Sequence, residues 1–131
     1  DLLGEIHDYL HEGVNAAERA GIPRERILVD PGIGFGKTFE HNYRLMGALH
    51  RFQDLAAGVL VGPSRKAFTG EFNKLPADRR QFSTAATVAI AALNGADVIR
   101  VHDVREMRQV VDILDKFRAL QQAKAQEIAD R

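Results

Sequence analysis

Residues 27–38 read ILVDPGIGFGKT, a short apolar run that ends in Asp30 and a glycine-rich loop. Such a run is too short for a helix and is typical of a buried strand. Two similar runs follow, so strands are predicted at residues 27–29, 59–61 and 98–101. Glycine, proline or aspartate bounds each of them, as expected where strands end in turns.

Apolar residues at helical spacing lie before, between and after these runs. They predict helices over residues 7–20, 42–52 and 78–93, and a fourth helix whose inner face runs from Val104 to Phe117. Strands that alternate with helices predict an α/β fold built from parallel β/α units.

The chain is expected to be one domain, residues 1–131, with a polar tail at residues 121–131 that frays. A three-stranded sheet leaves two open edges, and no strand precedes the first predicted helix. We therefore expect the natural domain to extend upstream, and the start at Asp1 without a methionine fits that expectation. The alternative is a small three-stranded domain that is complete in itself.

The composition excludes several classes of partner. The 18 basic and 18 acidic residues balance, so no overall charge attracts nucleic acid or an anionic membrane. No apolar stretch reaches the roughly 20 residues of a membrane span. Cysteine is absent, which excludes disulfides and thiolate metal sites and suits a reducing cytoplasm.

The glycine-rich loop does not match the common nucleotide-binding motifs. A P-loop requires glycine where Pro31 stands, and a dinucleotide fingerprint requires glycine at Lys37. What remains is the Asp30 carboxylate at a strand end, beside backbone that can approach a ligand closely at Gly34. A carboxylate there can accept two hydrogen bonds from the N–C–N edge of a pterin or purine. Alternatively, Asp30 only caps the following turn.

The second predicted strand also ends in polar residues. Gly62 and Pro63 lead into Ser64-Arg65-Lys66, which offers a hydroxyl group and cations to an anion such as a carboxylate. Alternatively, Arg65 and Lys66 are a solvated basic pair in a loop.

Arg100 and His102 are two residues apart on the third predicted strand, so their side chains share one face. Together they suit phosphate oxygens, although Arg100 can instead form an internal salt bridge with Asp30. Because the C-terminal ends of parallel strands meet at one edge, the three sites are expected to surround one ligand. That ligand would carry an amidine-like ring at one end and a diphosphate at the other.

Three stretches, residues 29–37 (VDPGIGFGK), 61–66 (VGPSRK) and 100–104 (RVHDV), resemble the C-terminal motifs of dihydropteroate synthases in order and spacing. The resemblance covers nearly the whole chain and implies the pterin-binding TIM-barrel family. The three strands would then be the last three of a (β/α)8 barrel, preceded by one helix, and this chain would be an incomplete barrel.

The resemblance also implies roles for the polar residues. Asp30 would hydrogen-bond the amino-pyrimidine edge of a pterin, Lys66 would contact the ring, and Phe35 would line the pterin pocket near the aminobenzoate. Arg100 would cover the pterin ring and, with His102, hold the diphosphate.

The remaining part of the implied site would bind 4-aminobenzoate. Ser64, Arg65 and Lys66 would lie near its carboxylate, the end that sulfonamide drugs mimic. Gly34 and Gly62 would let the backbone approach the ligands closely.

The implied reaction joins (7,8-dihydropterin-6-yl)methyl diphosphate to 4-aminobenzoate and gives 7,8-dihydropteroate and pyrophosphate. It needs no nucleophilic side chain, and we assign no nucleophile, general acid or general base. Mg²⁺ is the implied cofactor, with its ligand expected upstream and none in this chain. The chain alone is expected to lack turnover.

Two other functions stay open. One is a reduced-pterin-binding methyltransferase-type module, which needs no aminobenzoate site. The other is a non-catalytic barrel fragment that forms homo-oligomers or pairs with another chain through its open sheet edges.

Overall fold

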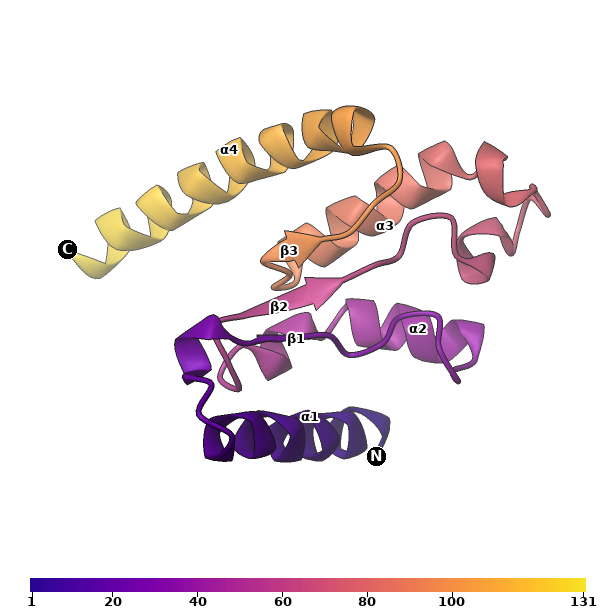
Figure 1. The fold of residues 1–131 in the computed structure, drawn as a ribbon. Coiled ribbons are helices and arrows are strands. Elements are labelled where there is room, and N and C mark those ends of the chain that lie inside the picture. Colours follow the sequence, from indigo (N-terminus) through magenta and orange to yellow (C-terminus); the bar gives the residue numbers. More distant parts are fainter.

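The computed structural model describes all residues, 1–131, and has an α/β fold (Figure 1). The strands are β1 (Leu28–Val29), β2 (Gly58–Val61) and β3 (Val98–Ile99), and the α-helices are α1 (Leu2–Arg19), α2 (Phe39–Met46), α3 (Gln81–Leu93) and α4 (Val104–Ala129). Short 3-10 helices lie at Arg24–Arg26, Leu49–Phe52, Ala67–Gly70 and Ala77–Arg79.

The three strands form one parallel sheet in the order β1-β2-β3. Val29 pairs with Val59, and Leu60 pairs with Val98. The predicted parallel sheet is confirmed, although β3 is shorter than expected. Arg100 lies just beyond β3, and its backbone N–H still donates to the Val61 carbonyl at 2.8 Å.

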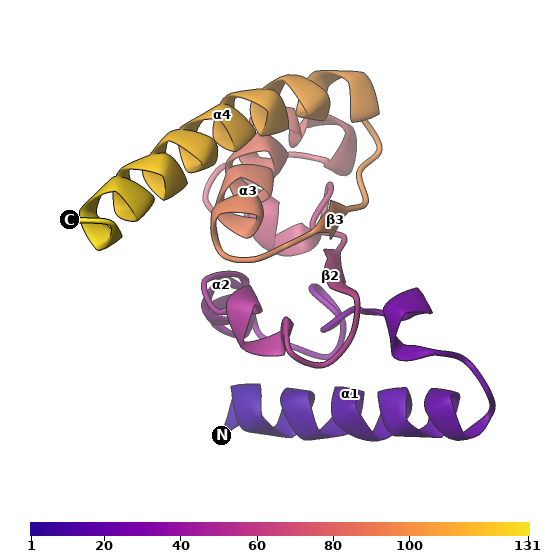
Figure 2. The same ribbon diagram turned by 90° about the vertical axis from the view of Figure 1, so that its left-hand side faces the viewer.

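The two faces of the sheet differ in what covers them. Val59 and Val61 are fully buried, and helices α2, α3 and α4 lie on one side of the strands (Figure 2). The alternate residues Leu28 and Val98 point to the other face and are 47% and 40% exposed. Side chains that follow the alternation of Leu28 and Val98 therefore lie on this more open second face.

The first three helices begin or end differently from the prediction. The helix predicted at residues 42–52 is α2 followed by a separate 3-10 turn, because Thr38 caps the N-terminus at His41 N–H and the α-helix ends before Gly47. The helix predicted from residue 78 begins as α3 only at Gln81. The first helix starts at Leu2, five residues ahead of the predicted His7.

Most of residues 121–131, the tail predicted to fray, are helical in the structure. Helix α4 continues to Ala129 and projects away from the sheet (Figure 1). The reason is that the sequence QQAKAQEIA consists almost wholly of good helix formers, without glycine or proline. All residues from Gln121 onward are exposed.

The hydrophobic core lies between the covered face of the sheet and the helices. It contains 13 buried residues, among them Phe52, Leu45 and Phe68. Helix α1 adds Val14 to this core and packs Leu10 against it. No α-helix in the structure combines the length and the apolar character that crossing a membrane requires.

Candidate functional site

The polar residues predicted to form one site lie at the same edge of the sheet. Asp30 directly follows β1, Lys66 follows β2, and Arg100 and His102 follow β3. Because the strands are parallel, these residues meet at one edge.

Asp30 has the two contacts that the sequence left as alternatives. Its Oδ1 accepts the backbone N–H of Gly32 at 2.9 Å, so it caps the turn. Its Oδ2 lies 3.9 Å from Nη1 of Arg100, which is an ion pair but too long for a hydrogen bond. The Asp30 side chain is 37% exposed and that of Arg100 is 60% exposed. Both groups therefore keep capacity for a ligand.

Gly62 makes room for the Arg100 guanidinium. A Cβ atom at Gly62 would lie 2.5 Å from Nη2 and 3.0 Å from Cζ of Arg100. The guanidinium therefore lies against the backbone of the middle strand and makes no hydrogen bond within the chain. The group against Gly62 in the structure is a side chain of the protein itself, and the predicted close approach of a ligand to this backbone stays a prediction.

Lys66 lies over the glycine-rich loop. Its ammonium donates to the carbonyl of Ile33 at 3.0 Å and lies 3.8 Å from the centroid of the Phe35 ring. Gly34 permits this approach, because a Cβ there would be 2.7 Å from Cδ of Lys66 and its φ is +84°. Phe35 is 64% exposed, so the ring offers an open apolar surface beside a cation.

The pKa of Lys66 is affected by charged groups from the loops after β1 and β3. Burial lowers the pKa of Lys66, and the positive charges of Arg100 and Lys37 lower it further, whereas Asp30 opposes the change. These groups are close enough to act on one another, as the prediction of a shared site requires.

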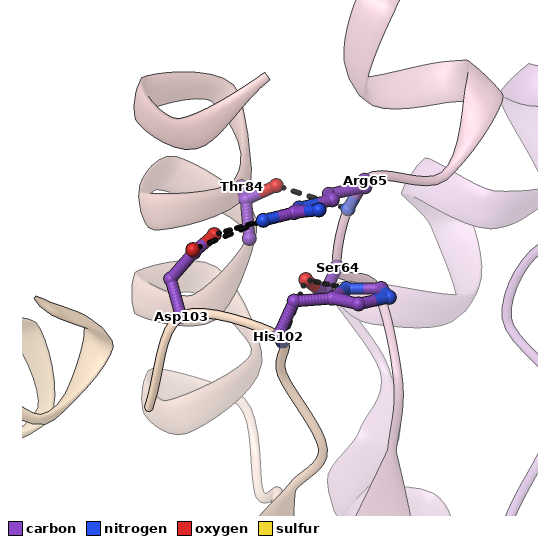
Figure 3. A network of polar contacts seen from close by, with 5 residues as sticks. All are labelled: Ser64, Arg65, Thr84, His102 and Asp103. Atoms are coloured by element: carbon purple, nitrogen blue, oxygen red, sulfur yellow. Dashed lines mark hydrogen bonds and ion pairs between the residues drawn. The ribbon is translucent and has the colours of Figure 1, made fainter. Parts of the chain in front are cut away.

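Ser64 and His102 form a separate pair within the site (Figure 3). Ser64 is 6% exposed, and its Oγ lies 2.7 Å from Nδ1 of His102 and accepts the His102 backbone N–H at 3.2 Å. Ser64 is therefore occupied within the chain and is not a free surface hydroxyl.

Arg65 is fixed by neighbours from three segments and is not a solvated loop residue. Its Nη2 donates to Asp103 Oδ1 at 3.0 Å, and its backbone N–H donates to Thr84 Oγ1 at 3.1 Å (Figure 3). Arg80 donates to the Arg65 carbonyl at 2.8 Å. These contacts hold Arg65 at a φ of +58°, which non-glycine residues seldom adopt.

Lys37 was not predicted to have a role, yet it stabilises the glycine-rich loop. Its ammonium donates to the carbonyls of Gly32 and Phe35 at 2.7 and 2.9 Å. Burial lowers the pKa of Lys37, and the charge of Asp30 opposes that change. No local pattern in the sequence indicated that this lysine turns back onto its own loop.

Asn42 was also missed as a supporting residue. It is 2% exposed, and its Oδ1 accepts the Gly34 N–H at 2.8 Å while its Nδ2 donates to the Thr38 carbonyl at 3.0 Å. A signal was available, because Asn42 shares the inward face of α2 with Leu45 and Met46. A polar residue at a core position needs such partners.

The residues of the chain do not fit a metal site by themselves. No three His, Asp or Glu side chains cluster anywhere in the structure. The carboxylate at the site, Asp30, faces the cations Arg100 and Lys66, which would repel Mg²⁺.

The family model and the similar sequences point to the same group of proteins. A family model described as pterin binding enzyme matches residues 1–102. Dihydropteroate synthase of Escherichia coli (strain K12) is 38% identical over 115 residues, which are 88% of this chain and 41% of that protein. The chain thus spans about two fifths of the length of this relative.

Solved structures agree with the sequence comparison. Yersinia pestis dihydropteroate synthase, solved with a sulfonamide drug, superposes with a TM-score of 0.88 at 36% identity over 92% of this chain and 44% of that chain. The Xanthomonas albilineans enzyme, solved with 4-aminobenzoic acid, gives a TM-score of 0.81 at 40% identity over 92% and 44%. The predicted resemblance and the β/α units of a TIM barrel are therefore confirmed. The chain belongs to the family of pterin binding enzymes.

Proposed function

We propose that this chain forms part of the active site of a dihydropteroate synthase. The complete protein would join (7,8-dihydropterin-6-yl)methyl diphosphate to 4-aminobenzoate, giving 7,8-dihydropteroate and pyrophosphate. The observation that carries this proposal is the meeting of Asp30, Lys66 and Arg100 at one sheet edge, in a chain similar to dihydropteroate synthases.

The pterin would lie between the loop that follows β1 and the loop that follows β2. The Asp30 carboxylate has free lone pairs to accept hydrogen bonds from the amino-pyrimidine edge. The exposed Phe35 ring and the ammonium of Lys66 would flank the ring system. Arg100 lies beside Asp30 and would cover the pterin ring.

The diphosphate would lie against Arg100 and His102. The Arg100 guanidinium has five N–H donors and none is hydrogen-bonded within the chain, so it is available to phosphate oxygens. In the reaction, the bond from the pterin CH₂ to the diphosphate oxygen breaks and a C–N bond to the amine forms. The amine then releases a proton to solvent. Arg100 and His102 would stabilise the negative charge that develops on the leaving diphosphate.

Lys66 is the best placed of the three aminobenzoate-site candidates to contact a carboxylate. Ser64 is held by His102 and Arg65 by Asp103, whereas Lys66 has no carboxylate within salt-bridge distance. Because the Xanthomonas and Yersinia enzymes were solved with 4-aminobenzoic acid and a sulfonamide drug, we propose both as ligands of the complete protein.

Two further predictions accompany this function. Mg²⁺ as a cofactor, with its ligand outside this chain, stays a prediction, and we derive no step of the reaction through it. The cytoplasmic location also stays a prediction from the cysteine-free composition.

Pterin binding tests the site directly. We expect the purified chain to bind 6-hydroxymethylpterin in a fluorescence titration and Asp30→Asn to weaken binding at least about tenfold, because hydrogen bonds to a charged acceptor are lost. The matched control is Asp112→Asn, which removes an exposed carboxylate of α4 paired with Arg108. Equal affinity of the Asp30→Asn variant and the wild type would contradict the proposed pterin site.

Activity tests the part played by the rest of the protein. We expect the purified chain to form no dihydropteroate. The side chains of Arg100 and Phe35 are largely exposed, so the site does not exclude water. Joining this chain to the preceding segment of the Escherichia coli relative is expected to give turnover that Arg100→Met abolishes. Turnover by the chain alone would disprove the first expectation. An active fusion that is insensitive to Arg100→Met would disprove the second.

A further inference from the structure

Ser64 binds His102 at two points, through the ring and through the backbone. The hydroxyl oxygen is 2.7 Å from Nδ1 and 3.2 Å from the backbone nitrogen of the same histidine (Figure 3). We propose that Ser64 is a positioning residue that holds the neutral imidazole of His102 in the tautomer with its proton on Nε2 and directs that N–H to an oxyanion. This inference rests on the proposed diphosphate site and adds the residue that orients one of its donors.

The hydrogen atoms available at Ser64 select the tautomer. A hydroxyl group has one proton to donate and two lone pairs. One lone pair accepts the His102 backbone N–H, and the only other partner of the hydroxyl is Nδ1. If the hydroxyl donates to Nδ1, the ring proton of neutral His102 must be on Nε2. If Nδ1 carried the proton, the buried Ser64 hydroxyl would have no acceptor, which is unfavourable.

The geometry leaves Nε2 of His102 free for a ligand. This nitrogen makes no hydrogen bond within the chain, and the ring edge that carries it points away from Ser64 and from α3 (Figure 3). The guanidinium of Arg100, two residues before His102, also makes no hydrogen bond within the chain. The Nε2–H and the guanidinium can therefore bind different oxygens of one diphosphate.

The strand register explains why Ser64 meets His102. These two residues are 38 positions apart in sequence, as are Arg65 and Asp103, which also contact each other. This is the spacing of the paired residues Leu60 and Val98 in β2 and β3. The pairing of the strands thus continues past their ends, where side chains replace the backbone as hydrogen-bonding partners.

The same hydrogen count limits what Ser64 can do for a ligand. Its single proton is used by Nδ1, so Ser64 has none to donate to the carboxylate of an aminobenzoate. Its effect on ligands is then transmitted through His102.

The tautomer can be measured without a ligand by long-range ¹H–¹⁵N NMR correlation on the ¹⁵N-labelled chain at about pH 9, where imidazole is neutral. We expect the wild type to be almost entirely protonated on Nε2 of His102. Ser64→Ala should shift the population towards the mixture of an unrestrained histidine, and Ser64→Thr, which keeps the hydroxyl, should restore it. The control is Thr87→Val, since Thr87 is also 6% exposed and its hydroxyl bonds only the Thr84 carbonyl.

Pyrophosphate is the probe for the functional consequence. We expect Ser64→Ala to weaken pyrophosphate binding about two- to tenfold, the range expected for one hydrogen bond, and Thr87→Val to leave it unchanged. Ser64→Cys keeps the side-chain size with a weaker hydrogen-bonding group, and should change both readouts in the same direction if Ser64→Ala does not fold.

The two readouts separate this inference from the proposed function. A wild-type His102 protonated mainly on Nδ1, or a tautomer insensitive to the loss of the hydroxyl, would overturn the positioning role. Tautomer changes as expected without any binding of pyrophosphate by the wild type would support the positioning role and count against the diphosphate site.

Discussion

The Arg100 guanidinium lies on a glycine, and this contact leads to a prediction at the scale of single residues. Gly62→Ala places a Cβ 2.5 Å from Nη2, and the flexible arginine moves aside more readily than the backbone. We expect the free energy of unfolding in urea to change by less than about 1 kcal/mol. Pyrophosphate affinity in a calorimetric titration should fall about tenfold, because a charge-assisted contact is displaced.

A second glycine provides the control for Gly62→Ala. Gly13 is within helix α1, and a Cβ added there would have no atom within 4 Å apart from its chain neighbours and the backbone of its own helix, so Gly13→Ala should stabilise the helix slightly. Pyrophosphate binding should not change. Equal affinity of the Gly13→Ala and Gly62→Ala variants would show that the position of the guanidinium does not matter.

Lys66 supplies a prediction about pH. Burial and the charge of Arg100 lower its pKa, so its ammonium loses the proton at a lower pH than an ordinary lysine, whose pKa is about 10.4. Arg100→Met removes a positive neighbour and should raise the pKa of Lys66, whereas Asp30→Asn removes the opposing negative charge and should lower it further. NMR titration of ¹³C-labelled lysine side chains measures both changes, and shifts in the reverse directions would contradict the shared site.

At the scale of secondary-structure elements, helix α4 divides into a packed part and an exposed part. Met107 is its one buried residue, at 4% exposure, and everything from Gln121 onward is exposed. Removing residues 121–131 should lower the helical circular-dichroism signal but change the free energy of unfolding by no more than about 0.5 kcal/mol. Met107→Ala should cost about 2–5 kcal/mol, because it leaves a cavity. A larger loss from the truncation than from Met107→Ala would contradict this division.

Contacts of Arg65 join the loops after β2 and β3 into one unit. Arg65 contacts Asp103 across the two loops, and Arg80, which precedes α3, holds the Arg65 carbonyl. The positive φ of Arg65 is compatible with a stable fold because these neighbours over-determine its position.

At the scale of the whole molecule, an uncovered surface remains beside β3. A groove of about 430 Å³, lined mostly by apolar residues, lies between this strand and helix α4. Val98 and Val104 in the groove are 40% and 65% exposed. An open strand edge beside an apolar groove favours pairing with another chain.

Self-association tests this view of the surface. Size-exclusion chromatography with light scattering should give a mass that rises with concentration. Val98→Lys should suppress the rise, because a charged lysine on the edge strand disfavours pairing. Ile128→Lys is the control, since Ile128 is 61% exposed on the projecting end of α4. A single monomer mass at every concentration would disprove the prediction.

Local sequence patterns were sufficient to predict the strands and the polar residues that follow them. Short apolar runs bounded by turn residues located the strands, and Asp30, Lys66, Arg100 and His102 follow closely after their ends. These are local properties, since a strand and its terminal turn depend on neighbouring residues. A local signal was also present but overlooked at Thr38, which begins α2 earlier than predicted.

Which side chains contact one another depends on the fold of the whole chain. The pairing of Ser64 with His102 and of Arg65 with Asp103 depends on the register between β2 and β3, and a slip of one residue would turn these side chains to the other face. That register is set by the packing of the whole sheet against its helices, which no short stretch of sequence contains. Side chains brought together from segments 38 residues apart are therefore a result of the fold and not of any motif.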